Sequence, residues 1–232
     1  MREAIALLTT LGGAAPLTSR ALRWFPLAGV FAGVIVGACW WGASEWWQPA
    51  VAAAIVVTVD LALTGMLHVD GVADTADGLL PPLPRERRLA VMRAPDVGAF
   101  GVAAVSAALL LEFAALASMH REPLVIVGLW CASRSLVASV PALVPYARVD
   151  GMASGLLAGA RRWPALFVVP AAVVAAVGAG RAGAAAVLVG VLAGIGVVAF
   201  AHRRIGGFTG DVLGAAIVVT QTVGLVVAAA RW

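Results

Sequence analysis

The residues from 182 to 201, AGAAAVLVGVLAGIGVVAFA, form a run of 20 amino acids without a charged side chain. A helix of this length crosses a hydrocarbon core of about 30 Å, because an α-helix rises about 1.5 Å per residue. The whole chain has this character: of its 232 residues, 62% are hydrophobic and 12% are charged. A soluble domain is about half apolar and roughly a quarter charged. The composition therefore excludes an ordinary soluble globule, and it excludes a disordered chain, which requires low hydrophobicity.

Further apolar stretches are long enough, or nearly so, to cross a bilayer. With the run above, the predicted spans are 24–43, 49–67, 98–118, 123–144, 164–180, 182–201 and 209–230. The sequence thus predicts an all-α, polytopic integral membrane protein of about seven transmembrane helices, forming a single membrane-embedded domain over residues 1–232. The shorter apolar segment 4–19 is expected to be interfacial or re-entrant rather than a cleaved signal peptide.

The arginines predict the orientation of these spans. All 16 basic residues are arginines, and the net charge is +4. With a cytoplasmic N-terminus, 12 arginines lie on the cytoplasmic side, three lie on the other side, and Arg134 falls inside a span. Positive residues concentrate in cytoplasmic loops, so we expect the N-terminus inside and the C-terminus outside. The longer connections near 68–97, 145–163 and 202–211 then face the cytoplasm, and function is expected there.

The most informative polar stretch is Gly65–Gly78, GMLHVDGVADTADG. Its aspartates Asp70, Asp74 and Asp77 are spaced i, i+4 and i+7, so on a helix they point within about 60° of one another. Like charges at this spacing repel, and a cluster of oxygen ligands suits a hard cation such as Mg²⁺. The alternative is a solvated polar loop at the membrane surface. His68 lies on the other side of the helix, and an interfacial or a catalytic role stays open for it.

A second polar feature, the turn Gly206–Asp211 with the sequence GGFTGD, precedes the last span. Backbone N–H groups at a helix N-terminus, together with the helix dipole, favour phosphate. Asp211 could instead cap the helix, and the arginines before the turn could serve only as topology signals. The candidate phosphate-binding residues of this region are Arg203, Arg204, Gly206, Gly207 and Thr209.

Three ionisable residues fall inside predicted spans: Asp60, Glu112 and Arg134. Such residues are costly in lipid and usually face the interior of a bundle or a cavity. Asp60 is predicted to reach the base of the cytoplasmic site. Arg134 is interpreted either as the partner of one of the two acids or as a ligand of a substrate phosphate, whereas Glu112 is interpreted as structural.

At this point the sequence resembles the cobalamin synthase family, the adenosylcobinamide-GDP ribazoletransferases. The acidic run Gly65–Gly78 is similar to the signature of that family. The stretches WFPLAG at Trp24–Gly29, Arg88–Gly101 with its ending GAFG, and GGFTGDVLGA at Gly206–Ala215 resemble other family elements in the same order. The resemblance covers nearly the whole chain.

The resemblance implies a Mg²⁺-dependent enzyme of late cobalamin biosynthesis in the inner membrane of a prokaryote. Adenosylcobinamide-GDP and α-ribazole, or its 5′-phosphate, would be the substrates, and GMP would be released; other cobalamin-assembly enzymes are expected partners, and nucleic acid is not. Asp70, Asp74 and Asp77 would hold Mg²⁺, and Asp211 would be a further ligand or the base for the ribazole 5′-hydroxyl, with His68 as the other base candidate. Arginines would neutralise phosphates, and the candidates are Arg93, Arg203 and Arg204.

Two other functions compete with this interpretation. A CDP-alcohol phosphotransferase also uses clustered aspartates, but its usual pattern has arginine after the alanine where this chain has Asp74 following Ala73. A transporter would explain the intramembrane Asp60, Glu112 and Arg134. It is disfavoured because the halves show no repeat and the polar residues concentrate on one face.

Overall fold

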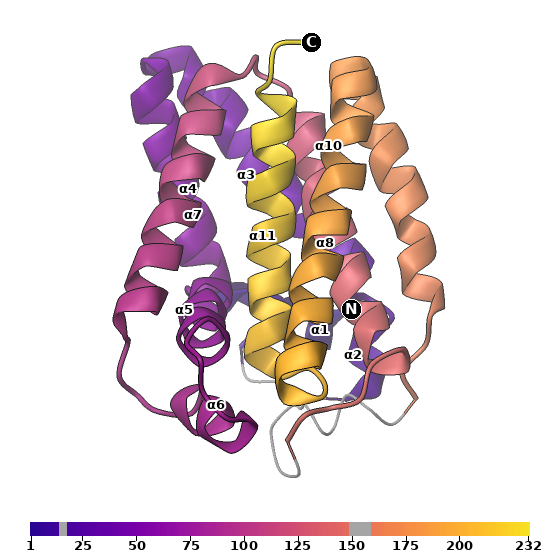
Figure 1. The fold of residues 1–232 in the computed structure, drawn as a ribbon. Helices are drawn as coiled ribbons and strands as arrows, with labels where there is room; N and C mark the ends of the chain where they lie inside the picture. Colours follow the sequence, from indigo (N-terminus) through magenta and orange to yellow (C-terminus); the bar gives the residue numbers. More distant parts are fainter. Residues whose placement is uncertain (14–17, 149–158) are drawn as a thin grey trace.

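The structure, a computed structural model, describes residues 1–13, 18–148 and 159–232. This part of the chain is helical and contains no β-strand beyond an isolated bridge between Tyr146 and Phe208, which confirms the predicted all-α class. The long helices run side by side along one axis (Figure 1). They are α3 (Phe25–Trp46), α4 (Pro49–Thr64), α7 (Ala99–Ser118), α8 (Pro123–Ser139), α10 (Val168–Ile205) and α11 (Gly210–Ala228).

Shorter helices precede, connect or extend the long ones. They are α1 (Arg2–Leu8), η1 (Thr10–Gly12), α2 (Ser19–Leu22), α5 (Leu67–Leu79), α6 (Arg85–Val91), η2 (Val140–Ala142) and η3 (Trp163–Phe167). The predicted re-entrant or interfacial segment 4–19 contains α1 and η1, and its residues 14–17 lie outside the described residues. Much of the predicted connection 68–97 is helical, as α5 and α6.

Five helices of the described chain are long and apolar enough to cross a membrane, or up to six if the bent pair α4–α5 forms one span. This count does not confirm seven spans, because it takes 163–205 as one helical unit. The backbone of α10 is non-helical at Ala179 and Gly180, where the predicted fifth and sixth spans meet. Figure 1 shows α10 turning back on itself at the end that carries the C-terminus.

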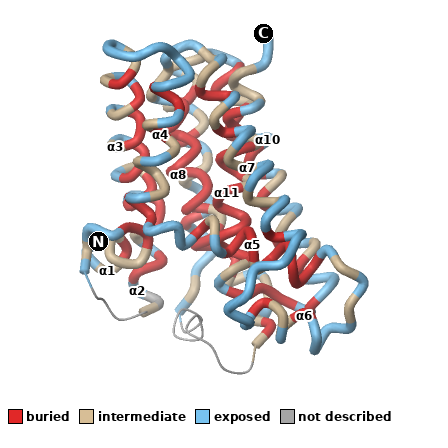
Figure 2. The backbone as a smooth tube through the Cα atoms, turned by 90° about the vertical axis from the view of Figure 1, so that its left-hand side faces the viewer, coloured by how far each residue is buried: buried red, intermediate tan, exposed pale blue. Residues whose placement is uncertain are grey.

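The short helices and the chain termini distinguish the two ends of the bundle. Figure 1 shows α1, α2 and α6 at one end and the C-terminus at the other. Figure 2 shows the N-terminus at the end that holds α5 and α6. Opposite ends for the termini are what the predicted arrangement requires, and which end faces the cytoplasm stays a prediction.

A sharp bend between α4 and α5 shapes the end that holds α6. The two helices meet at 88°, and both Gly65 and Met66 have left-handed backbone conformations, with φ of 59° and 60°. Glycine adopts this conformation freely, whereas a methionine does so at a cost. Thr10 Oγ1 bonds to the carbonyl oxygens of Ala62 and Leu63 at 3.3 and 3.4 Å, so η1 supports the bend. As a result, α5 lies across the end of the bundle.

Helix α8 forms the centre of the bundle, and most of its residues are buried. It approaches α3 closely: a Cβ on Gly29 would lie 2.4 Å from the carbonyl oxygen of Trp130. Small residues permit such close packing between helices in a membrane. The α3–α8 contact therefore depends on glycine at position 29.

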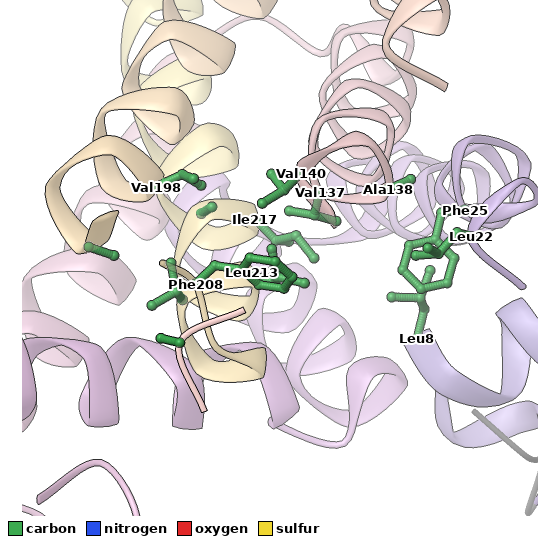
Figure 3. Close-up of a cluster of buried hydrophobic side chains, with 14 of the residues drawn as sticks. Leu8, Leu22, Phe25, Val137, Ala138, Val140, Val198, Phe208, Leu213 and Ile217 are labelled. Carbon is green, nitrogen blue, oxygen red and sulfur yellow. The ribbon is translucent and has the colours of Figure 1, made fainter. Parts of the chain in front are cut away.

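A cluster of buried apolar side chains holds together the end that carries α5 (Figure 3). Phe208, which precedes α11, and Leu213, in its first turn, pack there with Val137 of α8 and Val198 of α10. The same cluster includes Leu8, Leu22 and Phe25, so the N-terminal segment belongs to the packed core. This core fixes the first turn of α11, on which the candidate site depends.

Candidate active site at the end of the bundle

Helix α5 packs backbone to backbone against the start of α11. A Cβ on Gly71 would lie 2.7 Å from the carbonyl oxygen of Asp211, and one on Gly214 would lie 3.3 Å from the Cα of His68. Glycine at position 71 is required for this approach, because a Cβ there would overlap backbone, and a Cβ on Gly214 would make a tight contact. The contact brings the acidic face of α5 beside Asp211, although 137 residues separate Asp74 from Asp211 in the sequence.

The three aspartates of α5 have different surroundings. Asp70 is exposed, Asp74 is half-buried, and Asp77 is 8% exposed. The carboxylate of Asp77 accepts hydrogen bonds from the N–H of Gly98 at 2.7 Å and of Gly101 at 2.9 Å. These groups lie at the start of α7, where the first N–H groups of a helix have no partner within it. Asp77 therefore caps α7.

The glycines of the GAFG stretch make room for this cap. A Cβ on Gly98 or on Gly101 would lie 2.4 Å from an oxygen of Asp77. The motif and the last aspartate of the acidic run are thus two halves of one structural contact. The aspartate spacing predicts Asp77 as a metal ligand. The structure shows both of its oxygens bonded to backbone N–H groups, and the role as a ligand stays a prediction.

The carboxyl group of Asp74 is in a strongly negative environment. Its pKa is raised from 3.8 to about 6, first by burial and then by repulsion from Asp211 and Asp70. Arg148 lowers this pKa, and Asp77 raises it slightly. Helix α5 turns 88° away from α4, and Asp74 is partly exposed at the end of the bundle. A bound cation would relieve the repulsion among these carboxyl groups.

Arg148 belongs to this site and was missed by sequence analysis. Its guanidinium forms a salt bridge with Asp211 Oδ2 at 2.9 Å and donates to the carbonyl oxygen of Met92 at 3.2 Å. Thr209 Oγ1 donates to the same Asp211 oxygen at 3.2 Å. No motif marks Arg148; its only signal was its place in a predicted cytoplasmic connection. The contact joins residues 63 apart in the chain, so folding alone brings them together.

The turn Gly206–Asp211 is packed rather than open. Gly206 ends α10 in the left-handed conformation, and Phe208 N–H donates to Pro145 O at 3.0 Å. The N-cap of α11 is Thr209, whose hydroxyl accepts from Val212 N–H at 3.3 Å. The capping role considered for Asp211 thus belongs to Thr209, which leaves the Asp211 side chain to face Arg148 and the acidic face of α5.

The predicted phosphate-binding arginines lie at the rim of this end. Arg93, Arg203 and Arg204 are exposed, and the guanidinium of Arg204 lies over the Phe200 ring at 5.0 Å. Gly207 is buried against Pro145, where an added Cβ would clash with the carbonyl oxygen. The phosphate roles of these arginines, and of Gly206, Gly207 and Thr209, stay predictions.

Two further arginines hold the end of the bundle together. Arg88 is buried and donates to the carbonyl oxygens of Gly78 and Leu79 at 3.0 and 2.8 Å, which satisfies the C-terminus of α5. Arg85 donates to Ile205 O at 2.7 Å at the end of α10. Cations at helix C-termini interact favourably with the dipole. These arginines connect α6 to the two helices that lead into the site.

A polar network lies deeper, between the spans. Trp130 Nε1 donates to Asp60 Oδ1 at 2.9 Å, and Arg134, which is 1% exposed, donates to Ser133 Oγ at 3.1 Å. The amide oxygen of Gln221, suitably oriented, accepts from Trp130 and Arg134. Within the described residues Arg134 forms no direct salt bridge with either intramembrane acid. Glu112 accepts a hydrogen bond from Thr222 at 2.8 Å, which agrees with its interpretation as structural.

His68 lies in the first turn of α5, where its backbone packs against Gly214 of α11. It is 6% exposed, and its Nε2 has no hydrogen-bond partner among the described residues. In the part of the chain that the structure describes, no three His, Cys, Asp or Glu side chains are grouped so as to hold a metal ion by themselves. The acidic site is therefore an open arrangement of carboxylates rather than a closed metal cage.

These features define a class of protein: an integral membrane protein with an acidic site at one end of its helix bundle, built from α5 and the start of α11. The comparisons with known proteins identify the family. A family model described as cobalamin-5-phosphate synthase matches residues 1–229, so the chain belongs to the cobalamin-5-phosphate synthase family. No solved structure matches the chain.

Curated relatives agree with this assignment. A protein of Bradyrhizobium diazoefficiens named adenosylcobinamide-GDP ribazoletransferase is 38% identical over 219 residues, covering 91% of this chain and 84% of its own length. Proteins with the same name from Chlorobium phaeovibrioides and Ralstonia nicotianae are 34% and 38% identical, covering 88% and 85% of this chain and 84% and 80% of theirs. The predicted resemblance is confirmed, and neither the CDP-alcohol phosphotransferase nor the transporter is favoured.

Proposed function

We propose that this chain is an adenosylcobinamide-GDP ribazoletransferase that works at the end of the bundle formed by α5, α6 and the start of α11. The family and the names of the relatives support the reaction. The observation that carries the location is the packing of Gly71 against Asp211, which sets the acidic face of α5 beside the α11 N-terminus. We further propose that this end faces the cytoplasm of a prokaryotic cell, where nucleotide substrates are found.

The reaction is a phosphoryl transfer. The 5′-hydroxyl oxygen of α-ribazole forms a bond to the phosphorus that carries cobinamide, the bond from that phosphorus to the GMP oxygen breaks, and GMP leaves. The hydroxyl proton passes to a base. Such reactions depend mainly on positioning and on neutralising charge on the phosphate oxygens. A site for this chemistry needs a cation, a base and cationic side chains at one place.

The carboxylates fit a Mg²⁺ ion. Mg²⁺ is usually held by one or two carboxylates together with substrate phosphates and water. Asp70 and Asp74 supply the exposed and half-buried carboxylates, and the pKa of Asp74 is raised by burial first and then by the neighbouring acids Asp211 and Asp70. Bound Mg²⁺ would neutralise the pyrophosphate and polarise the reacting phosphorus. The open arrangement of the described acids suits a site that the substrate completes.

The remaining side chains then take defined roles. Asp77 is proposed as a third ligand that at the same time anchors α7, and Asp211 as a further ligand or the base. Its half-buried carboxylate, held by Arg148 and Thr209, is more accessible than buried His68, which supports Asp211 over His68 as the base. Arg148, which pairs with Asp211, is proposed to bind a substrate phosphate, and a bound cation would then neutralise Asp211 in its place.

The test uses the purified protein in detergent or liposomes. Adenosylcobinamide-GDP and α-ribazole are added with and without Mg²⁺, and GMP release and cobalamin formation are measured. We expect products that require Mg²⁺, that are lost in Asp74→Asn and that are retained in Glu86→Gln, which removes an exposed carboxylate from α6. No product from folded wild-type protein would refute the proposed function. Equal activity of both variants would refute the location.

A further inference from the structure

A hollow at the same end of the bundle as the acidic site, away from α5, is lined by arginines. It has a volume of about 240 Å³ and is bordered by Arg20, Arg23 and Arg161 together with Trp163. These residues come from α2, the short connection between α2 and α3, and the chain at the start of η3. Figure 1 shows α2 on the side of the bundle opposite α5 and α6. The hollow is therefore separate from the acidic site.

The charge of this hollow is not compensated by described residues. The described salt bridges are Arg121–Glu45 and Arg148–Asp211, and neither involves these arginines. Glu3, an acid of the same end, accepts a hydrogen bond from Thr18 Oγ1 at 2.6 Å instead. Clustered arginines without acidic partners favour an anion, and guanidinium groups match phosphate geometry.

An apolar hollow follows one turn further along the same helices. It measures about 190 Å³, and no charged residue lines it. Leu27, four residues after Arg23, lines it from α3, and Phe167, four residues after Trp163, lines it from η3. Gly128 of α8 and Ala171 of α10 also line it, and the two helices pack closely there, because a Cβ on Gly128 would lie 2.7 Å from Ala171 O. The two hollows thus stack in the direction in which both chain segments enter the membrane.

The surroundings match the membrane interface. Trp163 is 40% exposed beside the arginines, and Leu166 and Val169 are 71% and 67% exposed where α10 begins. Tryptophan concentrates at the interface, and exposed aliphatic side chains on a membrane-spanning helix face lipid. A ligand in the charged hollow therefore has its other end at the level of lipid tails.

We propose that the arginine hollow and the apolar hollow together bind one anionic phospholipid. The phosphate would bind Arg20, Arg23 and Arg161, the glycerol region would lie against Trp163, and an acyl chain would occupy the groove between α3, α8 and α10. Basic pockets between transmembrane helices on the cytoplasmic side are known to hold anionic headgroups. A soluble phosphate compound would use the arginine hollow and leave the apolar hollow without an occupant.

The experiment is native mass spectrometry of the full chain in detergent with added phosphatidylglycerol. Phosphatidylcholine tests the need for negative charge, and glycerol phosphate tests a free headgroup. The variant Arg23→Gln/Arg161→Gln removes two cations from the hollow, and Arg87→Gln/Arg162→Gln removes two exposed cations outside it. Val174→Phe fills the apolar groove and keeps the arginines.

We expect phosphatidylglycerol to be retained by the wild type and by the control variant. Retention should weaken on the order of thirtyfold in Arg23→Gln/Arg161→Gln, given the usual contribution of each arginine near an anionic surface. It should also weaken in Val174→Phe. Equal retention of phosphatidylcholine, equal loss in the control variant, full competition by glycerol phosphate, or no effect of Val174→Phe would each overturn the proposal. Folding is checked by size exclusion and thermal unfolding of every variant.

Discussion

Replacing Asp77 by alanine tests whether the last aspartate of the acidic run is a structural cap. In the wild type its carboxylate accepts two backbone hydrogen bonds, at 2.7 and 2.9 Å, while being 8% exposed. Hydrogen bonds to charged groups contribute about 1.5–3 kcal/mol each. Gly98 is exposed, so its N–H regains water in the variant, whereas the bond to Gly101 is buried. We therefore expect Asp77→Ala to lower the free energy of unfolding by about 3 kcal/mol.

Thermal unfolding of the purified protein in detergent measures this loss. A chain of this size changes its Tm by roughly 2–4 °C per kcal/mol, so Asp77→Ala should lower Tm by about 6–12 °C. Asp77→Asn retains one acceptor oxygen, so its Tm should lie between those of the wild type and Asp77→Ala. Asp74→Ala is the matched control, since Asp74 has no side-chain hydrogen bond among those described and its removal relieves repulsion. An unchanged Tm in Asp77→Ala, or an equal decrease in Asp74→Ala, would refute the assignment of Asp77 as the cap.

Three further predictions concern the site. Gly71→Ala places a Cβ 2.7 Å from the carbonyl oxygen of Asp211 and should reduce ribazoletransferase activity on the order of 100-fold. Gly210→Ala is the control and should retain activity, because its Cβ meets no atom within 4 Å. Equal activities of the two variants would contradict the requirement for close contact between α5 and α11. In the presence of a chelator, lowering the pH from 7 to 5 should raise the Tm of the wild type relative to that of Asp74→Asn. The reason is that Asp74 takes up a proton with a pKa of about 6 in the folded state and of 3.8 in the unfolded chain, so protonation stabilises the folded state. Parallel Tm curves for the two proteins would contradict the raised pKa of Asp74. Arg148→Gln should lower activity about 10- to 100-fold, because it breaks the salt bridge that holds Asp211. Arg148→Lys should have an intermediate activity. Wild-type kinetics in Arg148→Gln would show that Arg148 does not contribute to the reaction.

Much of the architecture could be predicted from the sequence alone. A long run of apolar residues crosses a bilayer as a helix, because a helix satisfies the hydrogen bonds of every backbone polar group within the segment itself. The runs that became α3, α7, α8 and α11 were therefore predictable from composition. The break at Ala179–Gly180 was visible as the boundary between two predicted spans, since clustered glycines interrupt a helix. The motifs that resemble cobalamin synthases also indicated the family, which the comparisons confirm.

The tertiary structure decided how the polar residues are used. The spacing of Asp70, Asp74 and Asp77 predicts one cluster, yet the oxygens of Asp77 accept hydrogen bonds from the start of α7. The left-handed conformations at Gly65 and Met66 turn α5 across the end of the bundle. Arg148 and Asp211 meet across 63 residues, which no local pattern encodes. Hydrophobicity is a property of each segment and can be read along the chain. A hydrogen bond or an ion pair depends on which partner the packed helices bring within about 3 Å, and that distance exists only in the folded protein.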